Sequence, residues 1–213
     1  MAKFGVDPHG RWDKNLAQQQ FQAHVSNIMD KYRQASPEML KGGHEWYERA
    51  HDIANTLGKG NVERGAGVIA ALSPQTGWGR NIDLATELFH HGTASHTEDN
   101  LNKALRIHAG EDPRSVLGGH KVRSFYENIV DPSNPHPVTI DRHAHDIAVG
   151  IPFRGTATPE NMPGKANVDL GLGAMGRYKH FEQAYKHASN ELGIELPHKV
   201  QATTWVQHRG AIG

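Results

Sequence analysis

The sequence predicts an all-α protein without a substantial sheet, and three observations support this fold class. Apolar residues recur at steps of three and four along most of the chain, which is the spacing of one buried helix face. Glycine and proline separate these segments at positions where helices end. Only residues 137–140 resemble a strand, and this segment is too short to form a sheet. Roughly eight to ten helices are therefore expected.

The first half of the chain contains five expected helices. Residues 15–34 carry a single apolar stripe, which predicts one long amphipathic helix. Ser36 is expected to cap the next helix, which Pro37 opens and which continues to Leu57. Asparagine and threonine at the expected starts favour capping of the helices that follow. These helices are expected over residues 61–72, 80–90 and 97–108.

The second half of the chain contains four more expected helices and one irregular excursion. The excursion covers residues 151–165, where prolines and glycines interrupt the helical pattern. Residues 1–213 are expected to form a single all-α domain, built either as one body or as two helical lobes with a cleft between them. The helices of this half are expected over residues 121–130, 141–149, 181–188 and 200–209.

Composition excludes several classes of protein. The 213 residues contain no cysteine, so a disulfide framework, a thiolate zinc site and an iron–sulfur cluster are excluded. Lys and Arg total 23, as do Asp and Glu, so any nucleic-acid affinity must come from a local basic site. No apolar run approaches the roughly 18 residues of a membrane span. We therefore expect a cytoplasmic protein that does not contact a membrane.

Three segments carry chemical information beyond the helical pattern: residues 72–76, 117–121 and 138–143. In the second segment, Gly118 and Gly119 stand at an expected helix start, where paired glycines let the backbone turn tightly. The unpaired N–H groups and the dipole of a helix start attract phosphate. This segment therefore indicates a possible contact with a phosphorylated ligand.

Two interpretations are open for each of the last two segments. Lys121 and Arg123 add positive charge to the glycine-rich helix start, which indicates either a phosphate site or a plain junction with solvated basic residues. Asp141 follows an apolar triplet at another expected helix start. It is either a helix cap, the commonest role of such an aspartate, or a general base or charge stabiliser in a cleft.

In this order, the three segments resemble the helix-hairpin-helix DNA glycosylase superfamily, of which endonuclease III is the familiar member. Residues 72–76 look like the family's Leu-Ser-Ala-Gln segment. Residues 117–121 look like the second half of its glycine-rich hairpin, although the hairpin is shortened here and its proline is missing. Residues 140–143 are similar to its Val-Asp-Thr-His segment. The resemblance spans residues 68–150 and implies a glycosylase-like fold acting on a base extruded from DNA.

The resemblance also implies roles for single residues. Gln75 matches the glutamine that fills the gap left by the extruded base. Lys121 matches the lysine that, in bifunctional members, attacks the sugar C1′ and forms a Schiff base. Asp141 matches the catalytic carboxylate. Trp78 is expected either to stack on a base or to be a core aromatic, and its flanking glycines suit a loop.

A narrower resemblance concerns phage enzymes of thymine hypermodification, the α-glutamyl/putrescinyl thymine pyrophosphorylases or amino-acid:DNA transferases. These share Trp78 and Asn81 after a Ser-Pro pair, Gly119 and Lys121 before an aromatic-rich helix, and Arg142 after the aspartate. In them an amine displaces pyrophosphate from a diphosphorylated hydroxymethyl-uracil in DNA. This resemblance implies a small amine or amino acid as co-substrate, and the host cytoplasm as the location.

Together these resemblances imply that DNA is the partner and that Asp141 and Lys121 are the catalytic residues, without a cofactor. A metal site is not expected, because His143 and His145 are two residues apart and point to different sides of a helix. His143 is instead expected to hydrogen-bond to the hairpin or to Asp141. DNA or phosphate binding is expected from Gly118, Gly119, His120, Arg123, Arg142, Gln75, Trp78 and Asn81.

Two alternatives of other classes remain. In the first, the chain is a non-catalytic DNA-binding or interaction protein that keeps the fold. In the second, it is an unrelated all-α domain in which the motifs match by chance. An intact pair of Lys121 and Asp141 weighs against the first alternative.

Overall fold

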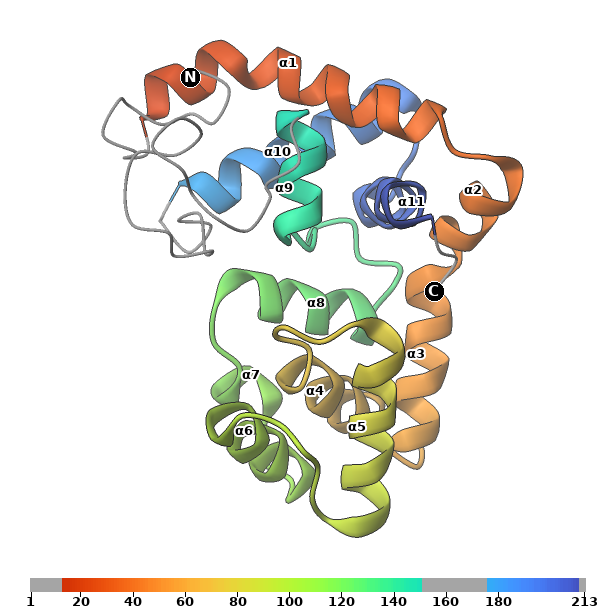
Figure 1. The fold of residues 1–213 in the computed structure, drawn as a ribbon, viewed down its shortest axis with the longest axis vertical. Helices are drawn as coiled ribbons and strands as arrows, with labels where there is room; N and C mark the ends of the chain where they lie inside the picture. Colours follow the sequence, from red (N-terminus) through yellow and green to blue (C-terminus); the bar gives the residue numbers. More distant parts are fainter. Residues whose placement is uncertain (1–12, 151–175, 211–213) are drawn as a thin grey trace. The chain divides into compact units, whose positions relative to one another are not determined.

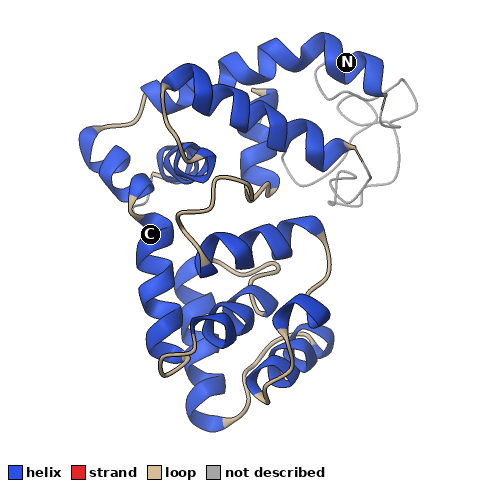
Figure 2. Ribbon diagram, turned by 180° about the vertical axis from the view of Figure 1, so that it is seen from behind, coloured by secondary structure: helices blue, strands red, loops and turns tan. Residues whose placement is uncertain are grey.

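The computed structural model describes residues 13–150 and 176–210, and every regular element in these ranges is a helix (Figures 1 and 2). This confirms the predicted all-α class. The described residues form eleven helices and no strand, and residues 137–140 are a connection without regular structure. The expected excursion at residues 151–165 lies outside the described residues. The helices are α1 (Lys14–Arg33), α2 (Pro37–His44), α3 (Trp46–Leu57), α4 (Val62–Ala71), α5 (Trp78–His91), α6 (Glu98–His108), α7 (Pro113–Val116), α8 (His120–Val130), α9 (Arg142–Val149), α10 (Arg177–Leu192) and α11 (Pro197–Arg209).

The chain divides into two compact units, each with its own core. Of the described residues, one unit holds residues 13–44, 140–150 and 176–210, and we call it the terminal unit. The other consists of residues 45–139, and we call it the central unit. The described residues before Glu45 and after Thr139 thus share one core, while those between them form the other.

Helix α11 is the centre of the terminal unit. It packs against α1, α2, α9 and α10, and Figure 1 shows it end-on among them. Buried positions occur on all sides of this helix, as expected for a helix surrounded by others. Small residues allow the closest approach: a Cβ on Gly43 of α2 would lie 2.4 Å from the Cα of Thr203. The contact of α2 with α11 therefore requires glycine at this position.

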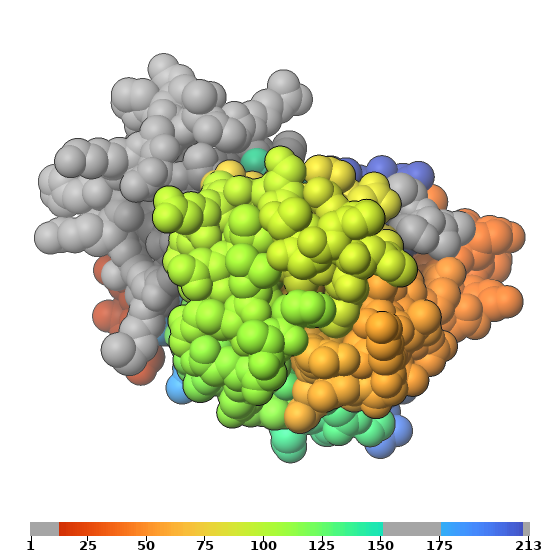
Figure 3. All heavy atoms as spheres, turned by 90° about the horizontal axis from the view of Figure 1, so that it is seen from below, coloured from red at the N-terminus to blue at the C-terminus, as the bar shows by residue number. Residues whose placement is uncertain are grey.

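Helix α4 is the centre of the central unit. It contacts α3, α5, α6, α7 and α8, and residues 65–71 are all buried. Gly65 lies directly against the carbonyl of Ala54 in α3, which explains why this helix is rich in glycine and alanine. Figure 3 shows orange residues of α3 and yellow-green residues of α6 on one face of this unit.

The structure corrects one predicted helix and adds another. The prediction of one helix from Pro37 to Leu57 is wrong. These residues form two helices, which are separated at Glu45. This break lies where the chain passes from the terminal unit to the central unit, so α2 and α3 pack in different cores. The short helix α7 was not predicted. It begins at Pro113, and its four residues are too few to show a helical pattern.

Candidate functional site

The start of α8 is an open, glycine-formed helix end in the central unit. Gly119 has φ 75°, a left-handed conformation that favours glycine, and no side chain caps the helix. Gly118, Gly119 and His120 are exposed, while the preceding Leu117 is buried and anchors the loop after α7. The predicted phosphate-binding glycines therefore lie at a helix start whose first N–H groups have no side-chain cap.

The two basic residues of this helix start differ in how they are held. The Nε of Arg123 donates a 2.8 Å hydrogen bond to the carbonyl of Leu117, which fixes the guanidinium beside the loop. Lys121 is half-buried and makes no hydrogen bond or ion pair with any described residue. Both side chains therefore keep N–H groups available for an anion.

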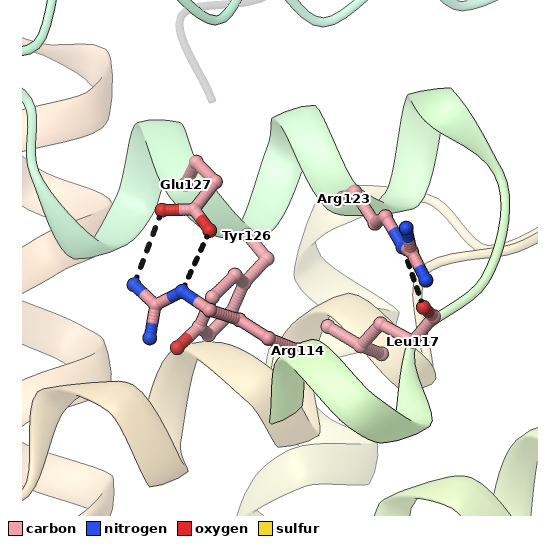
Figure 4. Close-up of a pocket in the computed structure, with 5 residues that line it drawn as sticks. All are labelled: Arg114, Leu117, Arg123, Tyr126 and Glu127. Atoms are coloured by element: carbon pink, nitrogen blue, oxygen red, sulfur yellow. Dashed lines mark hydrogen bonds and ion pairs between the residues drawn. The ribbon is translucent and has the colours of Figure 1, made fainter. Parts of the chain in front are cut away.

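A pocket of about 220 Å³ lies beside this loop, between α7 and α8 (Figure 4). Arg114 forms one wall, where it donates to Glu63 at 2.8 Å and to Glu127 at 3.0 Å. These hydrogen bonds raise the pKa of Arg114. Its guanidinium also lies 5.2 Å from the ring centre of Tyr126. Arg114 is thus a structural cation, and the cation of this pocket that remains available is Arg123.

Gln75 lies in the turn between α4 and α5 with a strained backbone. Its φ of 60° is unusual for a residue with a side chain, and the side chain is exposed. The turn is held by Ser73, whose hydroxyl donates to the carbonyl of Ala70 at 2.9 Å and whose carbonyl accepts from the Thr76 amide at 3.2 Å. Strain of this kind is concentrated at functional sites, which is compatible with the inserted position predicted for Gln75.

Trp78 and Asn81, both on α5, have different environments. Trp78 is half-exposed, and its ring centre lies 4.6 Å from that of Trp46 and 6.4 Å from that of Phe125. It is therefore part of an aromatic cluster and is still partly exposed. Asn81 is 2 % exposed, and its Oδ1 has no hydrogen-bond partner among the described residues. Its side chain is thus inside the central unit.

Asp141 is the N-cap of α9, in the terminal unit. Its Oδ1 accepts a 2.8 Å hydrogen bond from the Ala144 amide, and the side chain is half-buried. The preceding backbone is held by Tyr178, whose hydroxyl accepts a 3.0 Å bond from the Ile140 amide. The capping role is therefore present, and the second carboxylate oxygen makes no hydrogen bond to the described residues. Arg142 is exposed and has no acidic partner among them.

His143 departs from its expected environment. It makes no hydrogen bond to Asp141 or to any other described residue, and its Nδ1 is buried without a partner. Its ring centre instead lies 5.4 Å from that of His208, in the last turn of α11. Sequence reasoning missed His208, because no local pattern links a residue of α11 to the start of α9.

The structure groups the predicted site residues into two sets. Gln75, Trp78, Asn81 and the residues around the start of α8, including Lys121, belong to the central unit, while Asp141 and Arg142 belong to the terminal unit. Within the described residues, no group of three or more histidine, aspartate or glutamate side chains is arranged to hold a metal ion. None of the described helices has the length and apolar character needed to cross a membrane.

Comparison with known proteins identifies one family. The model of DUF7178, described as a family of unknown function, matches residues 12–212. No curated protein and no solved structure matches the chain.

Proposed function

We propose that this chain, which belongs to the DUF7178 family, is an enzyme that acts on an extruded base in DNA, with a glycosylase-like mechanism. The observation that carries the proposal is the start of α8. There an uncapped helix end, two exposed glycines and the available N–H groups of Lys121 and Arg123 form a surface suited to phosphate. The resemblance of three ordered motifs to the helix-hairpin-helix superfamily supports DNA as the source of this phosphate.

In the excision mechanism, the bond between the base and the sugar C1′ breaks and the base departs with the electron pair. Asp141 stabilises the positive charge that develops on the sugar. Either water or the amine of Lys121 then bonds to C1′, and Asp141 accepts the proton released. Gln75, exposed on its strained turn, occupies the space vacated by the extruded base.

A second candidate reaction is transfer of an amine onto a thymine-derived base. The amine nitrogen bonds to the 5-methylene carbon of a diphosphorylated hydroxymethyl-uracil, and pyrophosphate leaves with the electron pair of the C–O bond. Asp141 accepts the amine proton. The observation that favours this candidate is Arg142, an exposed cation without an acidic partner among the described residues, which follows Asp141 directly and suits a departing phosphate.

The test is mass spectrometry of nucleosides after incubation with DNA that carries normal, damaged or diphosphorylated hydroxymethyl-pyrimidines. A released base identifies excision, and a new base adduct, formed only when an amine is supplied, identifies transfer. Asp141→Asn should lower the rate by at least roughly a hundredfold. Lys121→Gln should do the same where the amine of Lys121 is the nucleophile, and should cost less where water is. Lys179→Gln, which changes an exposed lysine of α10, is the matched control and should keep full activity.

Two results would overturn the proposal. Undiminished activity of Asp141→Asn would remove this carboxylate from the chemistry. DNA binding without any product from the whole substrate panel would identify a non-catalytic DNA-binding protein.

A further inference from the structure

Two histidines meet in the terminal unit where α9 begins and α11 ends. The rings of His143 and His208 are 5.4 Å apart between centres and tilted by 52°. The helices that carry them pack against each other and against α1. The Nδ1 of His143 is buried and has no hydrogen-bond partner among the described residues. A buried polar atom of this kind is costly unless a ligand or water satisfies it.

Three cations act electrostatically on this histidine pair. Arg142 adjoins His143 in the chain, and Arg209 adjoins His208, with its guanidinium 5.8 Å from the ring centre of Trp205. Lys31 of α1 is close enough to contribute to lowering the pKa of His208. None of the three cations forms a hydrogen bond or ion pair with a carboxylate in the described ranges. Two carboxylates, Asp141 and Asp146, also act on the pair, so the three cations leave an excess of one positive charge.

The electrostatic effects on the two histidines agree with this picture. Burial, and then the charges of Arg142 and Arg209, lower the pKa of His143, although Asp141 and Asp146 act against them. Burial, and then His143 and Lys31, lower the pKa of His208, again opposed by the same two aspartates. Both shifts favour the neutral imidazole, which offers one N–H donor and one acceptor nitrogen.

We propose that Lys31, Arg142, His143, His208 and Arg209 form a binding site for a phosphoryl group, which we call the α9–α11 corner. Guanidinium groups match the geometry of phosphate oxygens, and neutral imidazole N–H groups add donors without the cost of a further buried charge. The described residues hold no group of three or more histidine, aspartate or glutamate side chains arranged to bind a metal ion at this place. The choice of nucleic acid as the source of the phosphoryl group rests on the proposed function, because the corner begins at the residue that follows Asp141.

The test is a titration of the wild-type chain followed by NMR signals of the imidazole carbons, assigned with His143→Gln and His208→Gln variants. Four-residue thymidine single strands and inorganic pyrophosphate are added in separate arms. We expect both ring signals to shift in a saturable manner and both pKa values to rise, because a bound anion favours the charged imidazole. Shifts with the oligonucleotide identify a backbone phosphate, and shifts with pyrophosphate alone identify a free diphosphate.

Variants of exposed residues keep the test independent of folding. Arg142→Gln and Arg209→Gln should each weaken oligonucleotide binding roughly fivefold and lower the slope of log affinity against log salt by about 0.7. Lys179→Gln, an equal change of charge elsewhere in the terminal unit, should leave both quantities unchanged. Unchanged ring signals in both arms would overturn the proposal, as would equal weakening by Lys179→Gln.

The fate of the proposed function is read separately. If products form from DNA without any shift of the His143 and His208 signals, the phosphoryl site at the α9–α11 corner is refuted and the proposed enzymatic activity stands. If the signals shift in a saturable manner but no product forms, the phosphoryl site is supported and the proposed enzymatic activity is refuted.

Discussion

Arg177 donates a 3.1 Å hydrogen bond to Nε2 of His145 inside the terminal unit, where both side chains are almost completely buried. Because Nε2 accepts this bond, the ring carries its proton on Nδ1, which faces Asp146 at 3.2 Å. Protonation of Nε2 would place a second N–H against the guanidinium. Burial lowers the pKa of His145 to about 4 and is the largest effect. The hydrogen bond to Asp146 raises this pKa, and the charge of Arg177 lowers it further.

This relationship predicts that acid destabilises the terminal unit. The unfolded chain binds a proton at His145 near pH 6.5, whereas the folded chain does so only near pH 4, so stability is complete above pH 6.5 and is lost between these values. The loss is on the order of 3 kcal/mol for this residue. Urea denaturation between pH 7 and pH 4 measures it. His145→Asn should reduce the dependence, and the remainder should come in part from His180, whose pKa burial also lowers to about 4. The exposed His187→Asn should leave the dependence unchanged.

Substitutions of Asp141 separate its cap from its chemistry. Asparagine caps helices as well as aspartate does, so Asp141→Asn should change the free energy of unfolding by less than about 0.5 kcal/mol. Asp141→Ala removes the bond to the Ala144 amide and should cost about 1 kcal/mol. Under the proposed function both variants lose activity. Equal stability of the two variants in urea denaturation would show that the cap contributes nothing.

Two glycines of the central unit should respond in opposite ways to alanine. A Cβ on Gly65 would lie 1.9 Å from the carbonyl oxygen of Ala54, so Gly65→Ala should force α3 and α4 apart and cost roughly 1–3 kcal/mol or more. A Cβ on Gly79 meets nothing within 4 Å. Gly79→Ala should therefore stabilise α5 by about 0.5 kcal/mol. Thermal unfolding measures both; stabilisation by Gly65→Ala would contradict this packing.

Two buried tyrosines form a similar pair. The hydroxyl of Tyr126 is buried and has no hydrogen-bond partner among the described residues, so Tyr126→Phe should leave stability unchanged or raise it by up to about 1 kcal/mol. The hydroxyl of Tyr185 donates to the carbonyl of Ala144 at 3.1 Å. Tyr185→Phe should lower stability by about 1 kcal/mol. Denaturant titrations of the two variants test the contrast, and a clear loss in Tyr126→Phe would reveal a partner for its hydroxyl.

The helix starts were largely predictable, because capping joins residues three positions apart. Asn61 accepts from the Arg64 amide at 3.0 Å, and Ser36 accepts from the Met39 amide at 3.3 Å, both at predicted starts. Thr97 occupies its expected N-cap position but makes no side-chain cap bond. The candidate site was predictable only in part. The glycines and cations around the start of α8 are neighbours in the sequence and could be recognised together. His208, whose ring lies beside that of His143, is far from it in the sequence.

The sequence by itself determined the all-α class and most helix boundaries, because periodic apolar stripes and capping residues act within one or two turns. The tertiary structure alone decided that His145 and Arg177 are buried: both lie inside the terminal unit although their polarity favours the surface. It also decided the pairing of His143 with His208 and the break at Glu45. Such features depend on which helices pack together, and that choice is made by contacts between residues far apart in the chain.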